Sequence, residues 1–189
     1  MIKWIEETLE EVCIKVTDGA HKSPKAKDKG HYMVSVKDFL EYGFDFSNCK
    51  LISDEDYDNL ERSGCVPEKG DILVGKDGAR FFEDVIIYEQ DEKPALLSSI
   101  AIIRCNIEKI DPYYLYYLMK LPNVRKDVRE NYGSGSAIPR IVLKDFKRMP
   151  IKYPSDKKIQ EDIVSLLKNI DCKIKVNTQI NRNFDVLAA

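Results

Sequence analysis

One long amphipathic helix is predicted for the last fifth of the chain, from Ser155 to Leu187. Apolar side chains recur there every seven residues in two neighbouring positions, as in helices that pack along another helix. The stretch contains no Gly or Pro that would end the helix earlier. At 1.5 Å per residue the helix is roughly 50 Å long, more than a core built by this chain can cover. We therefore expect it to project and to pair with another helix; the alternative is a helix folded back on its own domain.

Eight residues form the expected pairing stripe of this helix. They are Ile163, Leu166, Leu167, Ile170, Ile174, Asn177, Ile180 and Phe184. A single Asn on an apolar seam costs stability but fixes the register and the number of partners. Lys173 interrupts the second, neighbouring seam of Leu166 and Ile180, and Leu167 and Ile174 widen the stripe beside it. The stripe predicts dimerisation through the C-terminal helix.

Length, composition and cysteine usage limit the class of protein. The 189 residues, 43% of them apolar, allow one sizeable core and an appendage. The sequence has no run of eighteen apolar residues and no signal-peptide pattern, so we expect a soluble, cytoplasmic protein without a membrane partner. The five cysteines are odd in number and include no CxxC, which favours reduced thiols over a zinc site or a disulfide frame.

Charge is distributed unevenly along the chain. The formal net charge is −2, but residues 31–74 carry −6 and residues 111–158 carry +6. A basic block beside an acidic one is compatible with a polyanion on one side and a protein partner on the other. Chance surface charge gives the same pattern, so both interpretations stay open.

The order of predicted elements favours a mixed α/β (α+β) fold. A globular, largely sheet-built domain is expected at residues 1–152, followed by the helix at 153–189. GDILVGKDGARFF has the pattern of a β-hairpin with a basic tip formed by Lys76 and Arg80. Pro112 begins a helix rich in tyrosine, and a Gly/Ser loop follows at residues 133–136.

No enzymatic motif is present in the sequence. The two histidines, His21 and His31, form no HExxH or paired-His spacing for a metal. Asp18, His21 and Ser23 are of catalytic-triad types, but they share one short loop without an oxyanion framework. The glycines at residues 75–78 and 133–136 match neither a Walker sequence nor GxGxxG. We therefore expect no catalytic residue, no metal and no cofactor.

Nucleic-acid binding has more support, because three polar loops carry many cations. Phosphate contacts from such groups supply salt-dependent affinity, and arginines at a tight turn can read guanine edges with two hydrogen bonds. Arg80 and Arg140 are the candidates for base reading, and plain solubility stays open as the alternative for these arginines as it does for each lysine. The expected DNA-binding residues are Lys22, Lys25, Lys27, Lys29, Lys76, Arg80, Ser134, Ser136, Arg140, Lys144, Lys147 and Arg148.

Several stretches stand in a characteristic order. They are Trp4, Asp18-Gly19-Ala20-His21, VSVKDF, GDILVGKDGARF, SSIAIIR with PYYLYYLM, and GSGSAIPRIVLKDFKRMPIKYP, followed by a helix with Gln160, Ile163, Leu167, Asp171 and Ile174. Together they resemble one half of the DNA-specificity subunit of type I restriction-modification systems, over nearly the whole chain. The family's customary Glu-Gln pair reads Ile159-Gln160-Glu161 here, a departure near the helix start.

The resemblance implies a target recognition domain at residues 1–152 and a conserved spacer helix at 153–189 that pairs antiparallel with a second such helix. Full-length relatives carry two of each, so this chain looks like a half-size subunit. It would bind double-stranded DNA as a homodimer, or with a second specificity half, and read an interrupted palindrome. By resemblance, methylation belongs to a modification methyltransferase subunit that uses S-adenosylmethionine. ATP-driven cleavage belongs to a restriction and translocation subunit, and the specificity subunit does no chemistry.

Two other classes of protein remain as alternatives. A fragment of a fused methyltransferase would carry an NPPY-like tetrapeptide and a Gly-rich cofactor turn, and neither occurs in the sequence. A coiled-coil adaptor would use the helix alone, with the basic loops incidental. DNA binding across a salt series separates the adaptor from the specificity subunit.

Overall fold

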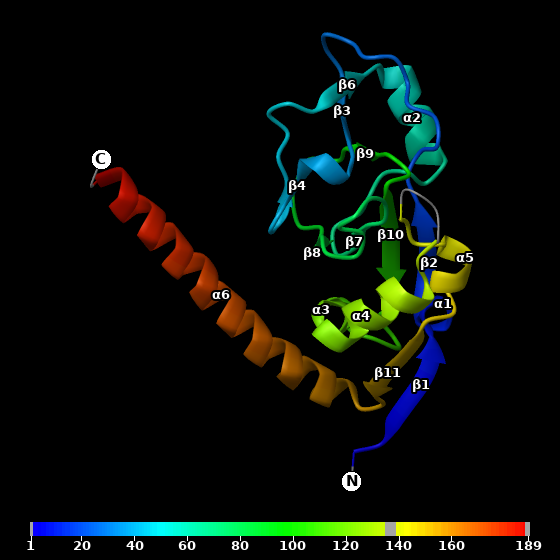
Figure 1. Ribbon diagram of the computed structural model, residues 1–189, viewed down its shortest axis with the longest axis vertical. Helices are drawn as coiled ribbons and strands as arrows, with labels where there is room; N and C mark the ends of the chain where they lie inside the picture. Colours follow the sequence, from blue (N-terminus) through cyan, green and yellow to red (C-terminus); the bar gives the residue numbers. More distant parts are fainter. Residues whose placement is uncertain (1, 135–138, 188–189) are drawn as a thin grey trace.

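A four-stranded antiparallel sheet lies at the centre of the computed structural model, which describes residues 2–134 and 139–187, with side chains up to Asn181 (Figure 1). In spatial order its strands are β2 (Cys13–Asp18), β10 (Ile100–Cys105), β7 (Ile72–Gly75) and β8 (Val85–Ile87). The run from Ile100 to Ile103 is fully buried, because alternate side chains enter two different core clusters. A strand covered on both faces requires such an unbroken apolar run.

A smaller sheet forms a second lobe. Its strands are β6 (Lys50–Ile52), β3 (His31–Val34) and β9 (Ala95–Leu96), with β3 and β9 parallel. Helix α2 (Asp54–Arg62) packs on it through Tyr57, and the Ser53 side chain caps its first turn. A 3₁₀ turn (Val36–Asp38) and the short hairpin of β4 (Phe39–Leu40) and β5 (Gly43–Phe44) border the lobe.

The two ends of the predicted recognition domain pair with each other. β1 (Trp4–Thr8) runs antiparallel to β11 (Pro150–Pro154), with Trp4 opposite Pro154 and Thr8 opposite Pro150. Thr8 and Glu11 form a capping box at the start of the one-turn helix α1 (Leu9–Val12). This pairing brings the N-terminal strand beside the start of the long C-terminal helix (Figure 1).

Three helices cover the lower part of the central sheet. α3 (Pro112–Lys120) begins with Pro at its first position, and the Asp111 carboxylate accepts hydrogen bonds from the next two free amides. Its side chains Leu115 and Met119 are fully buried. α4 (Pro122–Asn131) follows after a single extended residue, Leu121, and α5 (Leu143–Phe146) is a single turn.

Helix α6 (Lys157–Leu187) begins two residues later than expected and is anchored to the domain at its start. The buried Gln160 side chain accepts a hydrogen bond from the Asp111 amide (2.8 Å) and donates to the carbonyls of Pro154 (2.9 Å) and Lys109 (3.2 Å). Because all its polar atoms are satisfied by backbone groups, Gln160 fixes where the helix leaves the domain.

Further contacts hold the first half of α6 against α3. The Tyr117 hydroxyl donates to Asp171 (2.8 Å), and the Lys168 ammonium lies 3.5 Å from the centre of the Tyr113 ring. Lys175 reaches the Tyr42 ring at 3.7 Å. Beyond these contacts the helix extends away from the domain (Figure 1). The structure thus combines the two expectations: the first half of α6 packs on its own domain, and the second half projects.

The expected fold class is confirmed: a mixed α/β domain with a large share of sheet, followed by one long helix. The boundary between residues 152 and 153 falls inside β11 and stays a prediction. No helix in the described ranges is both long and apolar enough to cross a membrane.

Candidate nucleic-acid interface

The expected β-hairpin is present, and its tip meets the Gly/Ser loop. β7 and β8 pair antiparallel with Leu73 opposite Ile86, so residues 76–84 form the tip. The Gly78 amide donates to the Pro139 carbonyl (2.9 Å), and Asp77 forms a β-bridge with Arg140. Two of the loops chosen from the sequence therefore form one surface. We call the hairpin tip, helix α4, residues 133–134 and residues 139–141 the tip surface.

The two arginines assigned to base reading both lie on the tip surface and are exposed. Arg80 has 74% of its side chain exposed and is bonded to Glu83 (2.9 Å) and to Asp84 (3.4 Å). Arg140 is held by its backbone, because its carbonyl accepts from the Ser134 amide (2.7 Å). Arg80 is thus oriented by carboxylates, and Arg140 is held by the hydrogen bonds of its backbone, before any nucleic acid binds.

The expectation that Lys76 and Arg80 are both exposed at the hairpin tip is wrong for Lys76. It is buried, and its ammonium lies 2.6 Å from a carboxylate oxygen of Asp18. The other oxygen of Asp18 is 3.2 Å from the Nε2 atom of His21. Gly19 follows Asp18 at a place without room for a side chain, since a Cβ would lie 2.2 Å from the Leu96 carbonyl oxygen. Lys76 therefore joins β2 to the hairpin and is not presented to solvent.

Replacing Lys76 with Met should lower the free energy of unfolding by about 3 kcal/mol, because the nearly buried Asp18 charge loses its ammonium partner. Urea unfolding followed by circular dichroism measures the change. Lys37→Met, at an exposed position of the 3₁₀ turn, is the control and should change stability by less than about 0.5 kcal/mol. A loss below 1 kcal/mol for Lys76→Met would show that Asp18 needs no ammonium partner.

The lysine-rich segment forms a second, separate basic region. Lys22, Lys25, Lys27 and Lys29 are all exposed. The Lys27 amide donates to the Leu51 carbonyl (2.9 Å), which ties the segment to β6 in the second lobe. These lysines therefore lie beside the small sheet, and the tip surface belongs to the central one.

The remaining expected DNA contacts lie along the loop and the single-turn helix α5. Ser134 is half-buried at the base of the loop, and Ser136 lies outside the described residues. Lys144 and Arg148 are exposed. Lys147 is 3.1 Å from Glu10 and so also holds α5 against α1. None of these placements tests a role in DNA binding, and the assignments stay predictions.

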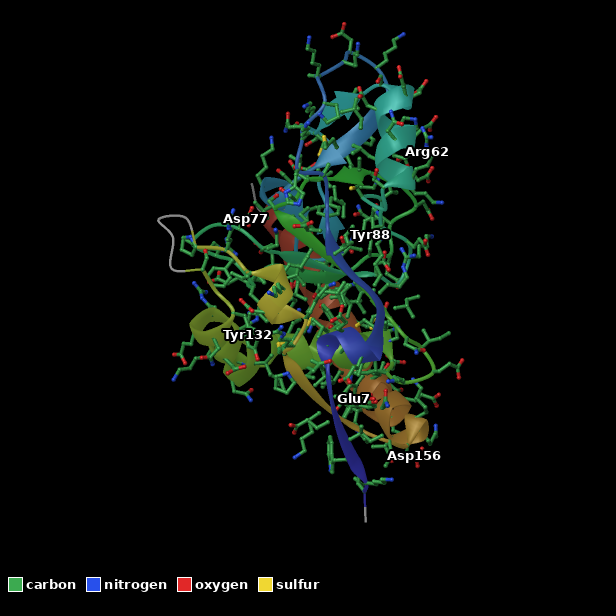
Figure 2. All side chains as sticks on the ribbon, turned by 90° about the vertical axis from the view of Figure 1, so that its right-hand side faces the viewer. Glu7, Arg62, Asp77, Tyr88, Tyr132 and Asp156 are labelled. Carbon is green, nitrogen blue, oxygen red and sulfur yellow. The ribbon has the colours of Figure 1, made fainter. Side chains whose placement is uncertain are left out.

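The hairpin tip and the acidic helix α2 lie on different sides of the domain. In Figure 2, Asp77 of the hairpin tip and Tyr132 at the end of α4 lie on the left, whereas Arg62 of α2 lies on the right. Helix α2 carries half of the carboxylates of the acidic block at residues 31–74, among them Asp54, Glu55 and Asp56. A polyanion bound at the tip surface would therefore not face the carboxylates of α2.

An apolar stripe on α6 is left uncovered by the domain. Leu166 is 64% exposed, Ile170 46%, Ile174 47% and Ile180 45%. Asn177 is also exposed, Ile163 and Leu167 are half-buried, and the side chain of Phe184 lies outside the described part. Residues that touch the domain, such as Val164 and Asp171, lie on another side of the helix.

A groove borders this stripe near the start of α6. Its volume is about 360 Å³, and its lining is mainly apolar, with Tyr114, Leu118 and Leu121 on one side and Ile163 and Leu167 on the other. The stripe and the groove together form a continuous apolar surface along α6.

The sequence matches the family model described as the type I restriction modification DNA specificity domain, over residues 1–183. The match spans both the sheet domain and nearly all of α6. The chain belongs to this family. No curated protein matches the chain significantly in sequence.

Solved structures share the fold of this specificity domain. The type I restriction-modification S subunit of M. genitalium is 17% identical, with a TM-score of 0.63, and the HsdS subunit of Thermoanaerobacter tengcongensis is 19% identical, with a TM-score of 0.61. A chain from a study of complex assembly and conformational transition of the type I R-M system is 19% identical, with a TM-score of 0.63. Each match covers 92% of this chain but only 38–40% of the other.

A DNA specificity domain recognises DNA and is not itself a catalyst, as the resemblance implied. Among the described residues, no three His, Cys, Asp or Glu side chains are grouped to hold a metal ion.

Cys13 and Cys105 face each other across β2 and β10, and the free thiols of Cys65 and Cys105 are buried.

The sequence-based list of expected contacts does not include the cations of the specificity domain's α4, which lie at the tip surface. Arg129 bonds Glu83 (2.6 Å) and the Ala79 carbonyl (2.7 Å), so α4 supports the hairpin tip from below. Lys126 is exposed on the same helix. The +6 charge of residues 111–158 was the available signal, but it gave no indication that α4 packs under the tip.

Proposed function

We propose that this chain is a half-size specificity subunit. Its sheet domain recognises one DNA half-site, and its α6 pairs antiparallel with the α6 of a second copy or of another specificity half. The pair directs a modification methyltransferase and a restriction subunit to an interrupted palindrome. The observation that carries the proposal is the family match, which spans one recognition domain and one long helix.

The uncovered stripe of α6 supports pairing. Leu166, Ile170, Ile174 and Ile180 are large apolar side chains aligned on one side of a helix, and burying them against a partner is favourable by roughly 25 cal/mol for each Å² removed from water. Asn177 on the same side offers an amide that pairs best with another polar group, which favours one register over others.

The tip surface supports DNA recognition. The backbone of Arg140 is fixed by a β-bridge to Asp77 and by the Ser134 amide, which suits a side chain that must reach the edge of a base. The lysines at 22–29 are exposed on a loop segment that is tied to β6 through Lys27, and exposed ammonium groups of this kind suit contacts to phosphates. Base reading would thus come from the tip surface, and sequence-independent affinity would come from the second lobe.

Arg140→Ala should weaken binding to a specific duplex about 10- to 100-fold and leave binding to random DNA almost unchanged, if its guanidinium reads a guanine. Lys25→Ala should weaken both equally and lower the salt slope by about one per chain. Fluorescence anisotropy across a salt series measures the affinity of each variant for the specific and the random duplex, together with the salt slope. Identical behaviour of the two variants would contradict the assignment of roles.

The specific duplex for that experiment comes from co-expression with a modification methyltransferase subunit, followed by mapping of the methylated sites. A pair of inverted half-sites is expected. An adaptor protein would bind neither duplex, and it would direct no methylation. The isolated chain should transfer no methyl group and hydrolyse no ATP.

A further inference from the structure

A polar cavity lies between the hairpin tip and the junction of α3 with α4. Its volume is about 480 Å³, and the short strand β4 closes one side with Phe39 and Leu40. The charged residues of its walls are Glu41, Arg80, Glu83, Asp84, Lys120 and Arg125. Three cations and three carboxylates line it, so the pairing between them decides what it can bind.

The carboxylates of the cavity wall are mostly neutralised by other groups. Glu83 is bonded to both Arg80 (2.9 Å) and Arg129 (2.6 Å), and Asp84 is within 3.4 Å of Arg80. Glu41 is exposed to solvent. Within the described ranges, no carboxylate oxygen comes within 4.0 Å of the Lys120 ammonium or the Arg125 guanidinium. Neither cation therefore forms an ion pair within the described part of the chain, although the carboxylates of Asp171 and Glu41 act on Lys120 from a greater distance.

Both cations are nonetheless partly withdrawn from water. The Lys120 ammonium donates to the Tyr116 hydroxyl (2.9 Å) and lies 4.8 Å from the centre of that ring, and burial lowers the pKa of Lys120. Arg125 donates from Nη2 to the Glu83 carbonyl (3.1 Å), and its buried Nε has no hydrogen-bond partner among the described residues. Holding a cation in this state costs free energy that an anion in the cavity would recover.

We propose that Lys120 and Arg125 form a binding site for one phosphate group of the DNA backbone. A phosphate offers several acceptor oxygens, which suits a guanidinium with a free Nε and a lysine with three donors. The cavity adjoins Arg80 on the tip surface, and α2 with its carboxylates lies on the other side of the domain. The site would position the backbone and thereby set how the tip arginines meet the bases.

This inference rests on the proposed function, because it requires the chain to bind DNA. The site differs from the contacts expected from the sequence, most of which lie in loops. Lys120 ends α3 and Arg125 lies in the second turn of α4, so both cations stand on helices fixed by the core. A phosphate held there gives a rigid reference point that loop lysines cannot give.

Lys120→Gln and Arg125→Gln test the site, because glutamine keeps a donor but loses the charge. Each should weaken binding to specific and random duplexes about tenfold at equal salt and lower the salt slope by about one per chain. The double variant should lower the slope no further, since both cations neutralise the same phosphate. Lys93→Gln, at an exposed position outside the tip surface and outside the lysine-rich segment, is the control and should change neither quantity.

Duplexes with one neutral methylphosphonate at successive positions identify the phosphate. One position should weaken wild-type binding about tenfold and leave Arg125→Gln binding unchanged. Thermal unfolding checks that the variants fold. If Arg125→Gln does not fold, Lys120→Gln still tests the site. Wild-type protein that binds no DNA would contradict the proposed function itself. Variants that bind DNA like wild type but lose assembly with the methyltransferase subunit would overturn the phosphate site in favour of a protein carboxylate.

Discussion

Replacing Ile170 and Ile174 with glutamate should convert a dimer into a monomer. Both side chains are about half exposed on the uncovered stripe of α6, so the single chain loses little when they change. In a paired helix each glutamate would place a charge in an apolar seam, at a cost of about 2 kcal/mol. Four such charges per dimer raise the dissociation constant by several orders of magnitude.

Light scattering at tens of micromolar measures the outcome. The wild-type protein should have about twice the chain mass of 21.8 kDa, and the double variant should have the mass of one chain. Ser165→Glu with Gln179→Glu adds the same charge at exposed positions of α6 outside the stripe, and this control should remain a dimer. A monomeric wild-type protein would remove the basis for pairing, and a monomeric control would show that charge alone prevents it.

The elements that could be predicted are those determined by residues close in sequence. The hairpin of β7 and β8 follows from an apolar run, a Gly-containing turn and a second apolar run. Helix α6 follows from a seven-residue repeat that continues for the length of the segment. In both cases the local pattern and the tertiary environment require the same structure.

Contacts between distant residues could not be predicted. Lys76 has the local sequence of an exposed turn residue, and only its pairing with Asp18, brought close by β10 between β2 and β7, explains its burial. Gln160 has the sequence context of a surface helix, and its backbone partners come from Lys109 and Asp111. Polar residues of this kind are recognised only when the residues that satisfy them are known.

The tyrosines of α3 lie between these two cases. The sequence shows that they surround more than one side of the helix, which a helix packed only on a sheet would not need. Tyr114 packs in the domain core, whereas Tyr113 and Tyr117 contact α6. The pattern indicated a second packing surface but could not identify α6 as its partner.

The contacts of Lys168, Asp171 and Lys175 with the domain determine which part of α6 sets the distance between two paired recognition domains. If two chains pair antiparallel, their recognition domains lie at opposite ends of the rods and are related by a two-fold axis. The 31 residues of α6 span about 46 Å at 1.5 Å per residue. The gap between the half-sites would then depend on the part of α6 beyond Lys175, where the helix has left the domain.

Duplicating residues 174–180 should lengthen the preferred spacer by about three base pairs. Seven added residues extend each rod by about 10.5 Å at 1.5 Å per residue, and duplex DNA rises about 3.4 Å per base pair. One whole heptad keeps the apolar stripe in register, and the original Lys175 stays beside Tyr42. A four-residue insertion after Lys168 would instead displace both Asp171 and Lys175 from the domain.

Mapping methylated sites with the reconstituted complex measures the spacer for both proteins. The half-sites should stay the same, because residues 1–152 are unchanged, and both targets should be palindromic in the homodimer. As a control, replacing residues 174–180 with another heptad of the same apolar pattern should leave the spacer as it was. An unchanged spacer in the duplicated protein would show that the distance is set by the methyltransferase subunits, and changed half-sites would show that α6 contributes to base reading.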